Sequence, residues 1–243
     1  MVSEMRYTDA LGLSAGDVVS IVGSGGKTSL LWRLAEENRE RGVLVSTTTK
    51  MRMPEVGAFD WDVSGDGTSG RPVAAPTGVS LFYGAVEDEK ITTPEIGRLF
   101  EFSAVARLTL LECDGAKERP LKGWAEHEPV VPGFTSVTIG VLPLWVIGRI
   151  VCEEIVHRMP TFYRIAGALP GEIVTARHLA RVINHPDGLF AKARGRQLLF
   201  LNYLENQKSE AFRRDFLTLL ELLEIPKRTF LGDIHRGTIE VLR

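Results

Sequence analysis

The chain has 243 residues, of which 44% are hydrophobic and 25% are charged, and this length and composition suffice for a globular core. Its 29 Lys and Arg residues nearly balance its 31 Asp and Glu residues, which excludes a generic electrostatic affinity for nucleic acid or for an anionic membrane surface. Only two cysteines are present, so the chain is not a disulfide scaffold.

The sequence also predicts no membrane partner. Its longest apolar stretch, residues 137–148, contains Pro143 and is shorter than the roughly 18 residues that a spanning helix needs. The N-terminal residues include the acid Glu4 and no apolar segment, unlike a secretory signal. We therefore expect a cytoplasmic protein.

The first predicted elements are a strand, a helix and a second strand. Residues 17–22 form a β-branched run that ends in glycines, which is typical of a buried strand. Residues 27–41 place leucines at helical spacing before Gly42, and residues 43–46 predict the next strand. Strand, helix and strand within about 30 residues form the βαβ unit of a parallel sheet.

The rest of the chain continues this alternation after one irregular stretch. Residues 54–80 are rich in Gly, Pro, Ser, Thr and Asp, so we expect a loop or short hairpin there, bordered by an edge strand at 79–83. Further strands are predicted at residues 107–113, 136–142, 197–202, 229–231 and 238–242, and an amphipathic helix at 210–223. The pattern predicts one α/β domain over residues 1–243, with helices on both faces of a mainly parallel sheet and an insertion at about 54–80.

A glycine-rich turn of sequence Gly23-Ser24-Gly25-Gly26-Lys27-Thr28 joins the first strand to the first helix. Glycines allow successive backbone amides to point inward, and the helix start adds its positive end, so the turn predicts a phosphate cradle. Lys27 is expected to contact the β and γ phosphates and Thr28 to bind Mg²⁺, with Ser29 in the same site. The Gly-x-x-Gly-Lys-Thr form is shorter than the usual motif and resembles the ATP loop of Mur-type peptide ligases. The alternative is a packing turn with an exposed lysine.

Two acids at the end of a later strand complete this predicted site. Residues 108–111 are apolar and run into Glu112, Cys113 and Asp114. We expect Asp114 to hold Mg²⁺ or its water and Glu112 to orient an attacking water, which makes them candidate catalytic residues with Lys27. The neighbouring acids are expected to raise the pKa of Cys113 and so to disfavour its thiolate. We therefore interpret Cys113 as a packing residue of the strand. Residues 47–50 leave the second strand at the same sheet edge, where one of them is a candidate sensor of the γ phosphate and a solvated loop is the alternative.

The segment after these acids is distinctive. It has the sequence Asp-Gly-Ala-Lys-Glu-Arg-Pro-Leu-Lys at 114–122 and Glu-His-Glu-Pro-Val at 126–130. With the glycine turn, and with residues 156–158, 185–189 and 199–202, it resembles the YqeC family of accessory proteins for selenium-dependent molybdenum hydroxylases. The resemblance runs from about residue 14 to 233. It implies a P-loop NTPase-like protein that binds a nucleotide and acts in maturation of a selenium-containing molybdenum cofactor, with that cofactor, a selenium-bearing intermediate or the hydroxylase as further partner.

Basic residues after Asp114 predict a second site. Lys117, Arg119 and Lys122 would form a cationic rim for an anionic substrate, such as a molybdopterin phosphate or a selenium oxyanion equivalent. Further candidates for this pocket are His127, His157 and Arg158. The alternatives are a solvated loop and structural histidines.

The sequence does not choose between ATP and GTP. Asn202-Tyr203-Leu204-Glu205 follows a late strand, where GTP-binding proteins carry Asn-Lys-x-Asp to bind guanine. Two of the three specifying positions differ, so Asn202 and Glu205 are candidates for contacting a base edge of either nucleotide. Zinc-binding spacings such as Cys-x-x-Cys are absent from the sequence.

Three functions fit these features. The first is an Mg²⁺-dependent NTPase or nucleotide-driven transferase. The second is a protein that holds a cofactor intermediate and uses the nucleotide only to order a loop, for which residues 53–80 are a candidate. The third, prompted by the shortened turn, is an ATP-dependent ligase.

Overall fold

The computed structural model describes residues 5–64, 77–204, 209–224 and 228–242. They form a mixed α/β fold with a mostly parallel central sheet flanked by helices. The strands of this sheet are β1 (Asp17–Gly23), β2 (Val43–Thr47), β4 (Trp61–Asp62), β5 (Val79–Leu81), β8 (Leu108–Glu112), β10 (Val137–Pro143), β12 (Arg196–Asn202), β13 (Arg228–Asp233) and β14 (Thr238–Val241).

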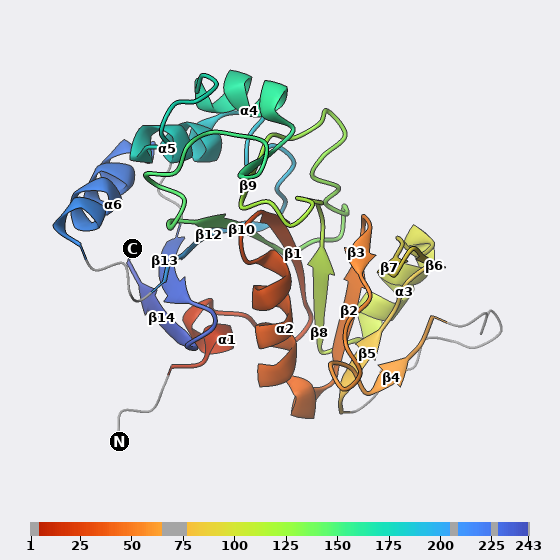
Figure 1. The fold of residues 1–243 in the computed structure, drawn as a ribbon. Helices are drawn as coiled ribbons and strands as arrows, with labels where there is room; N and C mark the ends of the chain where they lie inside the picture. The colour runs from red at the N-terminus through yellow and green to blue at the C-terminus, as the bar shows by residue number, and fades with distance from the viewer. Residues whose placement is uncertain (1–4, 65–76, 205–208, 225–227, 243) are drawn as a thin grey trace.

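The strand order across this sheet is β14-β13-β12-β10-β1-β8-β2-β5-β4, as Figure 1 shows in part. All neighbouring strands are parallel except the last pair, β13 and β14. Two smaller sheets lie outside it: β9 (Leu121–Lys122) pairs with β11 (Val156–His157), and β3 (Met51–Arg52), β7 (Lys90–Ile91) and β6 (Val86–Glu87) form an antiparallel set.

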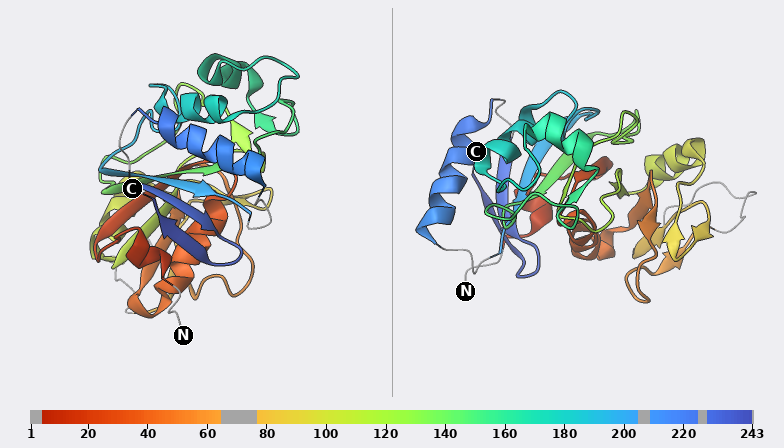
Figure 2. Two further views of the ribbon diagram at one scale, coloured as in Figure 1. Left: turned by 90° about the vertical axis from the view of Figure 1, so that its left-hand side faces the viewer. Right: turned by 45° about the horizontal axis from the view of Figure 1, so that its top comes forward.

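Helices cover both faces of the central sheet because alternate strand residues point to opposite sides. Val19 and Ile21 of β1 pack in one core with leucines of α2 (Lys27–Glu37) and with α1 (Tyr7–Ala10). Val18 and Val22 pack in a second core with the remaining helices, α3 (Ile96–Val105), α4 (Met159–Ala166), α5 (Ala176–Asn184) and α6 (Glu210–Leu222). The left view of Figure 2 shows α6 on one side of the sheet and α1 and α2 on the other.

The predicted strands and the two predicted helices, α2 and α6, are confirmed within a few residues, but two details were wrong. The helix predicted at residues 27–41 is α2, which ends at Glu37 and is followed by a 3-10 turn at Arg39–Arg41. The strand at Val79–Leu81 is not an edge strand, because β4 pairs with it in parallel. That parallel pairing also rules out a hairpin between these two strands, although residues 65–76 lie outside the described part of the chain.

The chain order of the strands reverses at β1, which positions the site. After β1 the chain builds β2, β5 and β8 on one side of it, and β10, β12 and β13 follow on the other side. Such a switch point opens a crevice at the carboxyl ends of the strands, where open α/β sheets bind ligands. The glycine turn begins at the carboxyl end of β1, and both acids follow at the end of its neighbour β8. Of the helices in the described residues, none has the length and hydropathy needed to cross a membrane.

Candidate functional site

The glycine turn is shaped by its contact with β10. Gly23, Gly25 and Gly26 have φ angles of 104°, 65° and 138°, which L side chains rarely adopt. A Cβ added to Gly25 would lie 2.4 Å from Cγ of Pro143, and one added to Gly23 would lie 2.2 Å from the carbonyl oxygen of Val141. Glycine is therefore required at both positions by backbone angle and by space.

Lys27 is folded back into this turn and does not extend into solvent. Its side chain is 5% exposed, and Nζ donates to the carbonyl of Gly23 at 2.8 Å and lies 3.3 Å from Oδ1 of Asp114. Burial acts to lower the pKa of Lys27, but Asp114 and then Glu112 outweigh it, so the pKa lies above its ordinary value. The lysine is a charged, positioned cation beside the turn.

Asp114 is the acceptor on which the site converges. It is fully buried, and its carboxylate accepts hydrogen bonds from the backbone N–H of Gly23 at 3.0 Å and from Nε1 of Trp124 at 2.8 Å. Burial alone would raise the pKa of Asp114, but the charges of Lys27 and Lys122 hold it below the usual range. Its oxygens are thus occupied by donors from three segments of the chain.

Glu112 has a different partner. Its Oε2 accepts a hydrogen bond of 2.6 Å from the hydroxyl of Thr28, in the first turn of α2. Burial raises the pKa of Glu112 and outweighs the opposing effects of Lys27 and Thr28. No side chain caps the start of α2 and no acid lies in its first turn, where Ser29 is exposed. The first-turn amides, the Thr28 hydroxyl and the Glu112 carboxylate are therefore grouped at one sheet edge.

A buried ion-pair cluster extends from Asp114 toward the second predicted site. Lys122 has no exposed side-chain surface, and its Nζ donates to Oε2 of Glu128 at 2.9 Å and to the carbonyl of Gly115 at 2.6 Å. The same Glu128 oxygen accepts from Arg158. Lys122 lies inside this cluster and not on a rim, which corrects the placement expected for it.

Of the other residues expected in the second site, Lys117 and Arg119 lie near His157, whereas His127 makes no contact that links it to them in the described part of the chain. Lys117 is exposed and near enough to His157 to affect its titration, and Arg119 donates to the carbonyl of Val156 at 3.2 Å, one residue before His157. Burial, and then the charges of Arg158, Lys122 and Lys117, lower the pKa of His157 to about 4, so it is neutral at pH 7. His127 is exposed.

Asn202 lies against the glycine turn. Its Nδ2 donates to the carbonyl of Gly25 at 2.8 Å, while Oδ1 is buried with no hydrogen-bond partner among the described residues. The hydroxyl of Ser24 is likewise buried and unpartnered within this part of the chain. Glu205, the other expected contact to the base, lies outside the described residues.

Thr47 and Thr48, from the loop proposed to contain a sensor of the γ phosphate, hydrogen-bond to the backbone. The hydroxyls of Thr47 and Thr48 donate to the carbonyls of Glu112 and Val130, at 2.9 and 2.6 Å. Cys113 is completely buried, and burial is the main reason that its pKa rises to about 12, which confirms it as a packing residue.

Two residues that organise the site were not predicted from the sequence. Trp124 orients Asp114, and Glu128 joins Lys122 to Arg158. Glu128 stands in the distinctive 126–130 segment, so that segment was the available signal. No sequence signal pointed to Trp124, because a tryptophan in a loop has no spacing that marks it as a hydrogen-bond donor to a buried acid.

Fold and site together define an α/β protein with a mostly parallel sheet and a glycine turn that faces two buried acids at its carboxyl edge. A family model described as YqeC protein matches residues 19–160, which include the turn, both acids and the buried ion-pair cluster. The uncharacterized protein YqeC of Escherichia coli (strain K12) is 30% identical over 228 residues, which cover 90% of this chain and 88% of that protein. The chain belongs to the YqeC family. No solved structure matches it.

Proposed function

We propose that this protein binds a nucleoside triphosphate with Mg²⁺ at the glycine turn, as a P-loop NTPase-like domain, and hydrolyses it or transfers its phosphoryl group. The observation that carries the proposal is the placement of Lys27 and Thr28 at an uncapped helix start, each in contact with an acid at or just after the carboxyl end of the neighbouring parallel strand β8. Phosphates suit such a helix start because its free amides and dipole favour negative charge.

Mg²⁺ fits the donors at this edge. The Thr28 hydroxyl and the Glu112 carboxylate supply hard oxygen ligands, and phosphate oxygens and water would complete an octahedral shell. No group of three or more His, Cys, Asp or Glu side chains that could hold a metal ion occurs in the described part of the chain, so the nucleotide must contribute ligands. When bound, Mg²⁺ neutralises charge on the phosphate oxygens.

The contacts favour an exchange of the roles first expected for the two acids. Glu112 touches the residue that would bind the metal, so we assign it to the metal site. Asp114 already accepts from Gly23 and Trp124 and neighbours two lysines, so we assign it to holding the turn, and to placing Lys27 beside the turn before the nucleotide binds. Lys27 would exchange its contacts with Gly23 and Asp114 for the β and γ phosphates.

The resemblance to YqeC proteins supports a pathway for this chemistry. We propose that the nucleotide drives a step in maturation of a selenium-containing molybdenum cofactor for a molybdenum hydroxylase. The second substrate would be anionic and would approach Lys117, Arg119 and Arg158 around the neutral His157. No role is assigned to the exposed His127.

Thermal unfolding with Mg²⁺ and ATP, GTP or neither tests nucleotide binding. A ligand at about 100 times its Kd stabilises the fold by roughly 2.7 kcal/mol, which raises Tm by roughly 5–10 °C for a chain of this size. We expect that rise in the wild type and in Lys90→Ala, which changes an exposed lysine of β7, but not in Lys27→Ala. The Tm of each variant with nucleotide is compared with the Tm of the same variant without it, so a change in stability caused by the substitution itself cancels. An equal rise in Lys27→Ala would refute the site.

One observation favours the gated binding protein as a second candidate. Lys27 and Thr28 are both engaged by acids, so a nucleotide must rearrange the turn in order to bind. Single-turnover measurement distinguishes the two functions. Bound triphosphate recovered intact after hours, in the presence of cofactor and hydroxylase, would indicate gating without turnover.

A further inference from the structure

We propose that a second small-molecule site, for an organic anion with a phosphate group on an apolar body, lies between α4, α5 and the end of α6. A cavity of about 510 Å³ opens there, within the range typical of ligand pockets. None of its lining residues belongs to the glycine turn or to the Lys122 cluster. The lining comprises Arg164, Ile165, Gly167, Arg177, Ala180, Arg181, Asn184, His185, Leu222 and Glu224.

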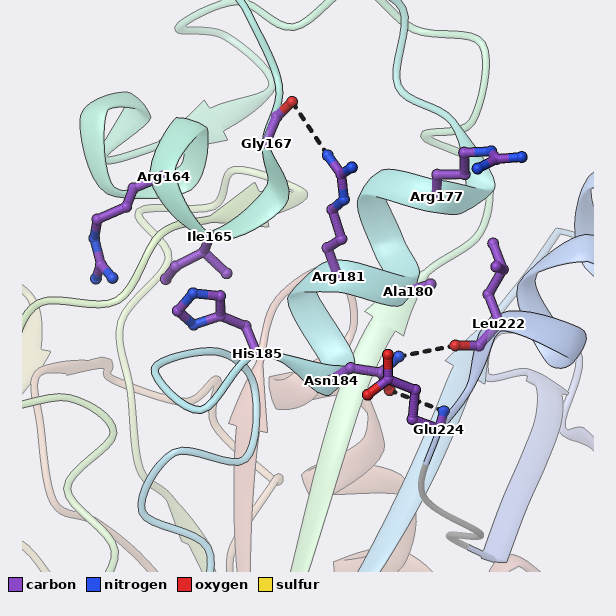
Figure 3. A pocket seen from close by; sticks show the side chains of 10 residues that line it. All are labelled: Arg164, Ile165, Gly167, Arg177, Ala180, Arg181, Asn184, His185, Leu222 and Glu224. Carbon is purple, nitrogen blue, oxygen red and sulfur yellow. Dashed lines mark hydrogen bonds between the residues drawn. The ribbon is translucent and has the colours of Figure 1, made fainter.

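Three arginines give this cavity its charge, although the whole chain has a net charge of -2. Figure 3 shows Arg181 extending from α5 toward the carbonyl of Gly167, with Arg164 and Arg177 on either side of it. Arg164 is paired with Asp187 at 2.7 Å, and the lining contributes a single acid, Glu224. Arg177 has no hydrogen-bond or ion-pair partner among the described residues, and Arg181 contacts only backbone carbonyls there.

Arg177 is exposed, and its place on α5 favours the binding of an anion. Arg177 is the second residue of α5, where a cation opposes the helix dipole, and no acid lies in that first turn. Arg177 and Arg181 are also four residues apart on one helix, so their like charges are neighbours and repel. A phosphate group would relieve both effects, because guanidinium groups bind it through charge-assisted, often bidentate hydrogen bonds.

The rest of the cavity limits the kind of ligand. Ile165 and Ala180 form the floor of the cavity and are almost fully buried, and the half-buried Leu222 offers apolar surface beside the arginines, which suits a ring or chain attached to the anionic group. Asn184 is occupied structurally, because its Nδ2 donates to the carbonyl of Leu222 and ties α5 to the end of α6. His185 accepts from the backbone N–H of Asp187 through Nδ1. Ligand specificity therefore depends on Arg177 and Arg181.

Phenyl phosphate is the minimal probe of this chemistry, and phenol is its uncharged counterpart. We would titrate each into the full chain and follow backbone amides and arginine Nε–H groups by NMR, to about 10 mM, which saturates a site with a Kd of about 1 mM. The proposal expects saturable shifts in α5, at Arg177 and at Arg181 with phenyl phosphate and none with phenol.

Two substitutions test whether phenyl phosphate binds at the arginines of the cavity. Arg177→Gln should weaken phenyl phosphate binding at least about tenfold, the loss expected when one charge-assisted hydrogen-bonding group is removed. Arg214→Gln, an exposed arginine on α6 outside the lining, should leave binding unchanged. The same shifts should persist in Lys27→Ala, so failure of the nucleotide proposal is distinguishable from failure of this one.

Several results would overturn the proposal. These are the absence of saturable shifts at α5, shifts confined to the glycine turn, equal binding of phenol, or undiminished binding by Arg177→Gln. A glutamate-rich peptide that shifts α5 where phenyl phosphate does not would instead identify a surface for an acidic protein segment, and would equally reject a small-molecule site.

Discussion

Asp114 and Glu112 stand two residues apart, yet their environments shift their pKa values in opposite directions. Four donors surround Asp114, including two lysines, and they outweigh the cost of burying its charge. Glu112 has one hydroxyl donor, and the charges of Lys27 and Lys122 act on it, but burial dominates. A divalent cation arriving beside Glu112 would lower its pKa and favour the ionised form, so Glu112 is the acid that metal binding changes most.

His157 predicts how stability depends on pH. Its pKa is about 4 in the folded protein and 6.5 ordinarily, so between these values the unfolded chain binds more protons. The free energy of unfolding should therefore rise with pH across that window, and its contribution from His157 should be lost as pH falls toward 4.

Urea denaturation at several pH values between about 4 and 6.5 measures this effect. His157→Gln should give a flatter dependence than the wild type, whereas His127→Gln, which changes an exposed histidine, should give the wild-type dependence. Identical slopes for wild type and His157→Gln would show that the folded histidine titrates normally.

A buried ion-pair cluster connects the short strand β9, which pairs with β11, to the carboxyl edge of the main sheet. Lys122 of β9 lies between Asp114 and Glu128, and all three side chains are nearly or fully buried. Removing one partner of a buried ion pair leaves an uncompensated charge, which typically costs roughly 3–5 kcal/mol. Lys122→Met should thus lower the free energy of unfolding by about that amount.

A double-mutant cycle and an exposed control test this prediction in urea denaturation. Lys122→Met combined with Glu128→Gln should cost less than the two single changes added, because they remove the same interaction. Lys50→Met breaks an exposed pair with Glu87 and should leave the free energy of unfolding almost unchanged, because solvent screens such pairs. Additive effects at Lys122 and Glu128 would mean that the pair is not coupled.

Periodicity predicted the sheet strands other than β4, because their apolar runs are bounded by glycines and turns, as at residues 17–23 and 43–47. It did not predict α3, α4 and α5, which have 10, 8 and 9 residues, because two or three turns give a helical pattern few repeats, even where the helix is strongly amphipathic, as α5 is. The glycine turn was predictable as a local motif. The contacts of Asp114 with Trp124 and Lys122 were not, because they depend on how β9 packs beneath the turn.

At the scale of the whole molecule, both halves of the sheet hold the glycine turn. β8 supplies Glu112 and leads into Asp114 on one side, while on the other β10 accepts from Ser24 through Val141 and β12 supplies Asn202. Asn202 therefore joins the far half of the sheet to the proposed phosphate site. Since its Nδ2 is used by Gly25, the geometry favours positioning of the turn over recognition of a base.

These two roles of Asn202 predict different nucleotide affinities. If Asn202 positions the turn, Asn202→Ala should weaken ATP and GTP by the same factor, about fivefold to tenfold for one lost hydrogen bond. If it contacts a base edge, the ratio of the two affinities should change instead. Isothermal titration of both nucleotides measures that ratio, with Gln197→Ala, an exposed position on the same strand, as control. An unchanged ratio with both affinities reduced would support coupling across the sheet, whereas a changed ratio would return Asn202 to the base site.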